Sequence, residues 1–229
     1  MRMLLLIWHC LAGCIGSVAQ SGEPALSVRF RFGTETLEPG RPYPLGSDTV
    51  VVDVCRFYLS GIQLHRAGQV VWAESDSYHL VDLRDSQTHH IPLAVPAGLA
   101  YDTLVYGLGV DSLTQAGGVR GGALDPLQGM YWTWQSGYIH FKLEGSCASC
   151  PDRGKSFQLH LGGYLAPWSA LQTLRAAVPA GHGLACHVDL KPVLLGADLS
   201  HTPRVMSPGE RSVLLSRLVA ENMQIHVVE

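Results

Sequence analysis

The chemically richest stretch of this chain runs from residue 129 to residue 145, with the sequence GMYWTWQSGYIHFKLEG. It places Trp132 and Trp134, two of only five tryptophans, one residue apart and between glycines and tyrosines. Aromatic side chains of this size are costly to leave in water, so the segment must either fill a core or build a binding site. One purely structural interpretation is that the paired tryptophans plug the open end of a sandwich of sheets.

Eleven histidines could ligate copper or zinc, since imidazole suits both metals. Apolar and polar residues alternate around several of them, which predicts the face on which each lies. His79 shares a face with Val81 and Leu83, the apolar side, where a buried imidazole needs a hydrogen bond or a bound ion. A core histidine satisfied by a backbone carbonyl is the alternative. His140 and His187 fall on polar faces and are expected to be exposed.

Three further residues are candidate ligands. His160 lies in residues 156–163, on the face opposite the apolar set and just before two glycines that would let a backbone or a ligand approach closely. An ordinary surface histidine is the alternative there. His201 and Met206 precede the last helical pattern, and imidazole with thioether could suit Cu(I), although loop residues of this kind can be incidental.

The cysteines predict a local crosslink. Cys147 and Cys150 have CxxC spacing, and Cys55 and Cys186 complete an even set once the N-terminal residues are set aside. An even number in an oxidising compartment favours disulfides, and no thioredoxin-like βαβ pattern surrounds the CxxC. We therefore expect a Cys147–Cys150 disulfide, with metal or redox use as the alternatives.

Residues 1–19 have the pattern of an export signal, with Arg2 before an apolar run. Cleavage after Ala19 is favoured, and a lipobox ending at Cys14, which would carry a lipid, is the alternative. No later apolar run approaches the roughly 18–20 residues that a membrane helix needs. We expect an exported protein, either in the periplasm or tethered at the outer membrane or cell surface.

Composition excludes several classes of function. The formal charge of −3 and the pI near 6.4 give no electrostatic footprint for nucleic acid. The chain contains no GxSxG, no HExxH and no phosphate-binding glycine loop in a strand-to-helix context. Nothing in the sequence therefore argues for an enzyme.

Short alternating stretches predict the elements that must position these residues. Strands are expected at 26–32, 50–65, 70–72, 78–83, 104–110, 138–144, 157–161 and 186–190, with a bend or break near Gly61. Ser207 as N-cap, Pro208 and Glu210 predict a helix near the C-terminus. We predict an all-β fold, an antiparallel β-sandwich with long loops and a short C-terminal helix, forming a single domain over residues 20–229.

Several motifs resemble those of the MbnP-like copper-binding proteins, in the same order and over nearly the whole mature chain. The segment at 129–145 is quite specific, and the others are supportive: 76–82, 109–112, 122–126, 157–163 and 201–209. The resemblance implies a periplasmic β-sandwich that binds copper, in which a tryptophan is oxidised to kynurenine and works with histidines. It also implies a di-haem peroxidase of the MauG type as the oxidising partner.

Carried over residue by residue, the resemblance matches His79 and His160 to recurring histidines of the family and Trp132 and Trp134 to its paired tryptophans. Cys147 to Cys150 looks like a local insertion. The leading hypothesis is an exported copper-binding protein that is not an enzyme. The alternatives are a cell-surface binding or adhesion module that uses the aromatic cluster without metal, and a CxxC thiol oxidoreductase.

Overall fold

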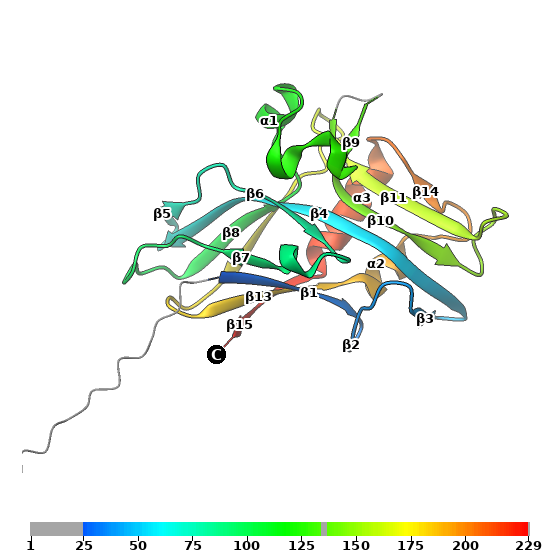
Figure 1. The fold of residues 1–229 in the computed structure, drawn as a ribbon, viewed down its shortest axis with the longest axis horizontal. Coiled ribbons are helices and arrows are strands. Elements are labelled where there is room, and N and C mark those ends of the chain that lie inside the picture. The colour runs from blue at the N-terminus through cyan, green and yellow to red at the C-terminus, as the bar shows by residue number, and fades with distance from the viewer. Residues whose placement is uncertain (1–24, 134–136, 229) are drawn as a thin grey trace, which may run out of the picture.

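The computed structural model describes residues 25–133 and 137–228, in which two β-sheets pack face to face (Figure 1). The predicted signal segment, Cys14 and Trp134 lie outside the described residues. The predicted all-β class is confirmed.

The smaller sheet carries the first strand of the domain at its centre. Its order is β15 (Met223–Val228), β13 (Gly183–Asp189), β1 (Ala25–Phe32) and β2 (Glu35–Thr36), with β7 (His90–Pro92) also paired to β1. In β1 the residues alternate as predicted, so that Phe30 and Phe32 are buried and Arg29 is exposed.

The larger sheet is organised around one long strand, β4 (Asp48–Arg66), which bends at Gly61, where φ is +58°. The order is β12 (Gln172–Ala177), β8 (Thr103–Leu108), β4, β10 (Gly137–Cys147), β11 (Ser156–Gly162) and β14 (Arg204–Val205). Four more strands join it: β3 (Pro42–Leu45), β5 (Gln69–Ala73) and β6 (Tyr78–Asp82) pair with β4, and β9 (Tyr131–Trp132) pairs with β10.

The sheets are mixed, which corrects the prediction of a purely antiparallel sandwich. Strands β1 and β13 run parallel, as do β11 and β14. Parallel neighbours need a long crossover, and here every strand of the larger sheet except β14 lies between β1 and β13 in the sequence. Strand alternation predicts which residues are buried but carries no information on such distant pairing.

Two cores result from this arrangement. The main core fills the space between the sheets, where Phe57 lies 5.8 Å from both Phe30 and Phe141, measured between ring centroids. The second core lies on the outer face of the larger sheet, under the short elements α1 (Ser112–Ala116), η2 (Gly122–Leu124), η3 (Pro126–Gln128) and β9. These elements cover the upper edge in Figure 1. The second core consists of Tyr58, Val110, Leu124, Met130, Trp132, Tyr138 and Ile139.

The remaining helices are η1 (Ser86–His89), α2 (Leu190–Gly196) and α3 (Glu210–Glu221). The predicted helix near the C-terminus is confirmed as α3, but its N-cap is Gly209 rather than Ser207, and β15 follows it. The Ser207 prediction is wrong because the chain enters the helix two residues later than the capping pattern suggests. Among the described residues, no helix has both the length and the apolarity to span a membrane.

A glycine at the irregularity between β10 and β4 gives the first prediction. At Gly145 a Cβ would overlap the Val51 carbonyl oxygen and approach Phe157 Cζ to 2.8 Å. We expect Gly145→Ala to destabilise the fold by about 2 kcal/mol or more, because backbone must move. Urea unfolding measures this, and Gly154→Ala, where the nearest atom is Ser156 Oγ at 3.7 Å, should change the midpoint little. Equal midpoints for the two variants would contradict the prediction.

Candidate functional site

Trp132 is held deep in the second core. Its side chain is 1% exposed, and it pairs across β9 and β10 with Gly137. The benzo edge of the indole lies on Gly162 of β11, where a Cβ would stand 2.9 Å from Trp132 Cζ3. The indole nitrogen is buried and lacks a hydrogen-bond partner within the described part of the chain. Such a side chain cannot act as a contact platform for a carbohydrate or a protein.

His160 lies two residues before Gly162 on β11, so both point to the same face as the second core. Only 5% of His160 is exposed, and its Nε2 lies 2.6 Å from Glu144 Oε1. Burial raises the pKa of Glu144, but hydrogen bonding to His160 and the charge of Lys142 together hold that pKa below its usual value. The ionised carboxylate can only accept, so Nε2 carries the proton and donates it.

The other ring nitrogen of His160 is therefore the free one. Nδ1 is buried, and the described residues supply it with no hydrogen-bond partner. Burial lowers the pKa of the His160 ring, and the hydrogen bond to Glu144 opposes that shift only in part. The ring is thus neutral at pH 7, with a lone pair on Nδ1 that points into a nonaqueous environment.

Met206 is the sequence-predicted candidate that the fold brings to His160. Strands β11 and β14 are parallel, with Leu159 opposite Val205, and both of these face the main core. The pairing ends at Leu159 and Val205, and the next residue along each chain segment is His160 on β11 and Met206 after β14. Met206 is half-buried. A thioether thus follows the strand that pairs with β11, which carries the unprotonated imidazole nitrogen of His160.

His79 lies elsewhere. Strands β4 and β10 stand between β6 and β11, and three strand spacings correspond to about 14 Å, so His79 and His160 cannot share one ion. His79 faces the same side as Val81, as predicted, but it is half-buried rather than buried because β6 is an edge strand. Its Nε2 lies 2.8 Å from Glu74 Oε2.

His201 differs from His160 in being exposed to solvent. Its side chain is 80% exposed, and its Nδ1 lies 2.8 Å from Asp198 Oδ1. Among the described residues, no group of three or more His, Cys, Asp and Glu side chains is placed to hold a metal ion. Any metal held by His160 would therefore need donors other than a cluster of these side chains, such as the thioether of Met206.

His140 corrects the expectation of exposure, since it is 1% exposed. The pairing of β10 with β11 shifts between Ile139 and Phe141, so the alternation that placed His140 on a polar face breaks at this residue. The amide of Gln115 on α1 fixes the ring, with 2.6 Å between Gln115 Nε2 and His140 Nε2. Gln115 Oε1 accepts from the Tyr138 backbone N–H at 2.6 Å, which ties α1 to β10.

A row of charged side chains positions the start of the aromatic segment. Arg56 on β4 forms an ion pair with Asp82 at 2.6 Å and donates from Nη1 to the Gln128 carbonyl oxygen at 3.0 Å. Lys142 donates to the Gly129 carbonyl oxygen at 3.3 Å. Both cations therefore hold the turn from which Trp132 enters the core.

The CxxC lies at the opposite end of β10. Cys147 and Cys150 form a disulfide with a Cα–Cα distance of 5.3 Å, next to the turn that leads to β11. Asp48 supports it by accepting from the backbone N–H groups of Ala148 and Ser149 at 3.1 and 3.0 Å. Cys55 and Cys186 are free and buried. The disulfide therefore crosslinks the start of the loop between β10 and β11, at the end of β10 away from the aromatic segment.

The profile of the MbnP family matches residues 21–207 of the chain. Among solved structures, MbnP from Methylosinus trichosporium is similar, with a TM-score of 0.55 and 14% sequence identity. The likeness covers 90% of this chain and 98% of that one, and at this identity it shows the shared fold alone. Comparison with curated proteins gives no match.

The burial of His140 predicts a pH dependence of stability. Burial lowers its pKa to about 4, whereas the ring titrates near 6.5 when unfolded. As the pH falls, the unfolded chain therefore binds this proton before the folded chain does. The contribution of neutral His140 to the free energy of unfolding is fully present above pH 6.5, and about 3 kcal/mol of it is lost as the pH falls towards 4. Unfolding free energies between pH 7 and 4.5 should show this loss in the wild type and in His201→Gln, and less of it in His140→Gln. A His140 NMR titration near pH 6.5 would contradict the assignment.

Proposed function

Since the chain belongs to the MbnP family, we propose that it is an exported copper-binding protein, without catalytic activity of its own, in which His160 is the principal ligand. The observation that carries the proposal is the state of the His160 ring. Its Nε2 is held by Glu144 while its buried Nδ1 has no partner among the described residues.

This geometry fits the usual environment of a metal-bound histidine. Such a histidine donates its second ring N–H to a carboxylate or carbonyl, which fixes the tautomer and raises the basicity of the ligating nitrogen. Glu144 has this position relative to His160. A buried imidazole lone pair with no partner is otherwise unfavourable, and a bound metal would satisfy it.

The neighbouring donor supports copper in the Cu(I) state. Thioether ligands favour Cu(I), and Met206 is the residue next to His160 in the extended register of β14. The nearby second core is apolar, which favours the ion of lower charge. His160 and Met206 would hold the metal, and its chemistry there would be binding and storage of copper.

Trp132 extends the proposal to a modified residue. It contacts Gly162, two residues from His160, so an oxidised product of its ring would lie close to the same site. Kynurenine would add an aniline nitrogen and a carbonyl, both potential donors that indole lacks. A di-haem peroxidase of the MauG type is the proposed oxidant. Trp134 is the alternative position of the modification.

Cu(I) competition titrations test the ligand assignment. We expect the wild type to bind a single Cu(I), His160→Ala to bind about 100-fold more weakly, and Met206→Leu and Glu144→Gln to bind about 10-fold more weakly. His79→Ala and His201→Ala are matched controls that should bind as the wild type does. Undiminished affinity in His160→Ala would overturn the assignment.

Mass spectrometry of the protein isolated from its native source tests the modification. Conversion of tryptophan to kynurenine adds about 4 Da, and we expect this increment on the peptide that contains Trp132. Protein expressed without a peroxidase of this class should lack the increment. Fragmentation of the peptide, which also contains Trp134, locates the increment. An increment on Trp134 alone would move the modified position, and an unchanged mass of this peptide in copper-loaded native protein would exclude kynurenine.

A further inference from the structure

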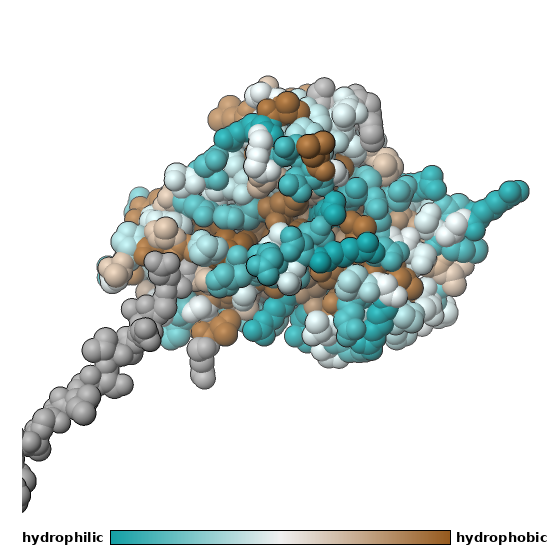
Figure 2. Space-filling model, in the orientation of Figure 1, coloured by the Kyte–Doolittle hydropathy of each residue, from teal (hydrophilic) through white to brown (hydrophobic). Residues whose placement is uncertain are grey.

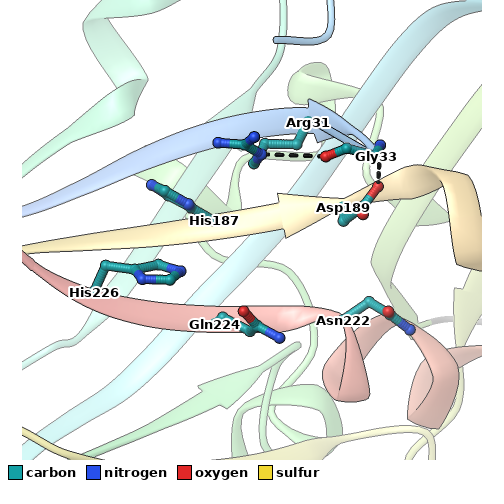
Figure 3. A pocket seen from close by; sticks show the side chains of 7 residues that line it. All are labelled: Arg31, Gly33, His187, Asp189, Asn222, Gln224 and His226. Atoms are coloured by element: carbon teal, nitrogen blue, oxygen red, sulfur yellow. Dashed lines mark hydrogen bonds between the residues drawn. The ribbon is translucent and has the colours of Figure 1, made fainter. Parts of the chain in front are cut away.

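The outer face of the smaller sheet carries a hollow of about 370 Å³ that the copper proposal does not use. Figure 3 shows its residues along three adjacent strands, β1, β13 and β15, with Gly33 just after β1 and Asn222 between α3 and β15. The residues that line it are Arg31, Gly33, His187, Asp189, Asn222, Gln224 and His226. Hydrogen-bond donors predominate among these side chains.

Strand register explains why cationic groups gather here. Arg29 on β1 pairs with His187 on β13, which pairs in turn with Gln224 on β15, so the three share one face. Arg31 pairs with Asp189 one step along the same face. His226 lies diagonally from His187, and the centroids of their rings are 4.2 Å apart.

The one carboxylate of the hollow is already engaged. Asp189 Oδ1 accepts from the backbone N–H groups of Gly33 at 2.8 Å and Lys191 at 3.0 Å. Arg31 is held in place by the carbonyl oxygens of Gly33 and Thr34, at 3.3 and 2.7 Å. The Arg31 guanidinium is thus fixed in position, and the Asp189 carboxylate offsets part of the positive charge but not all of it.

His187 adds an unsatisfied polar atom. Its Nε2 is buried and has no hydrogen-bond partner in the described ranges. Burial lowers the pKa of His187, and His226, Arg31 and Arg29 lower it further. Three other charged or titratable groups lie on elements next to this face: Lys191, His90 and Glu35. His90 lies opposite Ser27 in the strand pairing, and Glu35 forms an ion pair with Arg41. Two arginines and two imidazoles therefore lie together on this face, with Asp189 as the carboxylate among the residues that line the hollow.

We propose that this hollow is a binding site for a tetrahedral oxyanion of the phosphate or sulfate type. Arginine and imidazolium N–H groups recognise such oxygens by charge-assisted hydrogen bonds. The arginines disfavour a metal cation, because their positive charge repels it. An oxyanion would accept from His187 Nε2 once that ring is protonated, so its binding raises the imidazole pKa, and affinity rises as the pH falls.

NMR titration of the mature chain with sulfate, which stays doubly charged from pH 7.5 to 5.5, tests this proposal without copper. We expect saturable shifts of the His187 and His226 ring signals, with about tenfold tighter binding at pH 5.5 than at pH 7.5. Arg29→Gln should weaken binding about fivefold or more, because it removes an exposed charge at the rim. Arg175→Gln, an exposed arginine of β12 in the other sheet, is the matched control and should leave the affinity unchanged.

Three results would overturn the proposal. The first is the absence of saturable shifts at His187 and His226, and the second is equal weakening by Arg29→Gln and Arg175→Gln. The third is perturbation of both ring signals by Zn²⁺ at lower concentration than by sulfate, which would assign the imidazole pair to a metal. Inorganic phosphate at pH 7.5 should reproduce the sulfate shifts, which acetate should not, since it has a single charge and no tetrahedral centre.

Discussion

The burial of β4 on both faces is the constraint on which the rest of this structure depends. Phe57 and Leu59 face the main core, while Tyr58 faces the second core, and all three are fully buried. An apolar side chain such as Tyr58 on the outer face of the sheet must be covered by another part of the chain. Here the segment from 109 to 132 must fold over that surface, and doing so carries Trp132 into the interior.

The site forms at the margin of that second core. Glycine at position 162 leaves room for the indole, and His160, two residues earlier, reaches the same face with one nitrogen held by Glu144. The position of the His160 ring thus depends on packing rather than on a dedicated loop. The disulfide and the cationic hollow lie on other parts of the fold and do not contact this arrangement, so each can be altered separately.

Alternation and turn residues were sufficient to predict most strands, including the long β4 and its bend at Gly61. Three features were beyond that reasoning. The first is the parallel pairing of β1 with β13, which joins residues far apart in the chain. The second is the parallel pairing of β11 with β14, which brings the segment before Met206 to the strand of His160. The third is the burial of His140, which follows from a bulge. The local sequence pattern predicts which residues face the core. The three features instead depend on pairing between distant strands, which the local pattern does not specify.

The bulge in β10 also limits how the chain can change in length. On its N-terminal side, Tyr138 and Ile139 belong to the second core, and on its C-terminal side Phe141 belongs to the main core. Adding or deleting one residue at this bulge would turn side chains that now face one core towards the other face of the sheet. Residues 137–141 therefore tolerate substitution better than insertion or deletion, whereas the exposed turn at Ala67 and Gly68 is a suitable place to lengthen the chain or attach a tag.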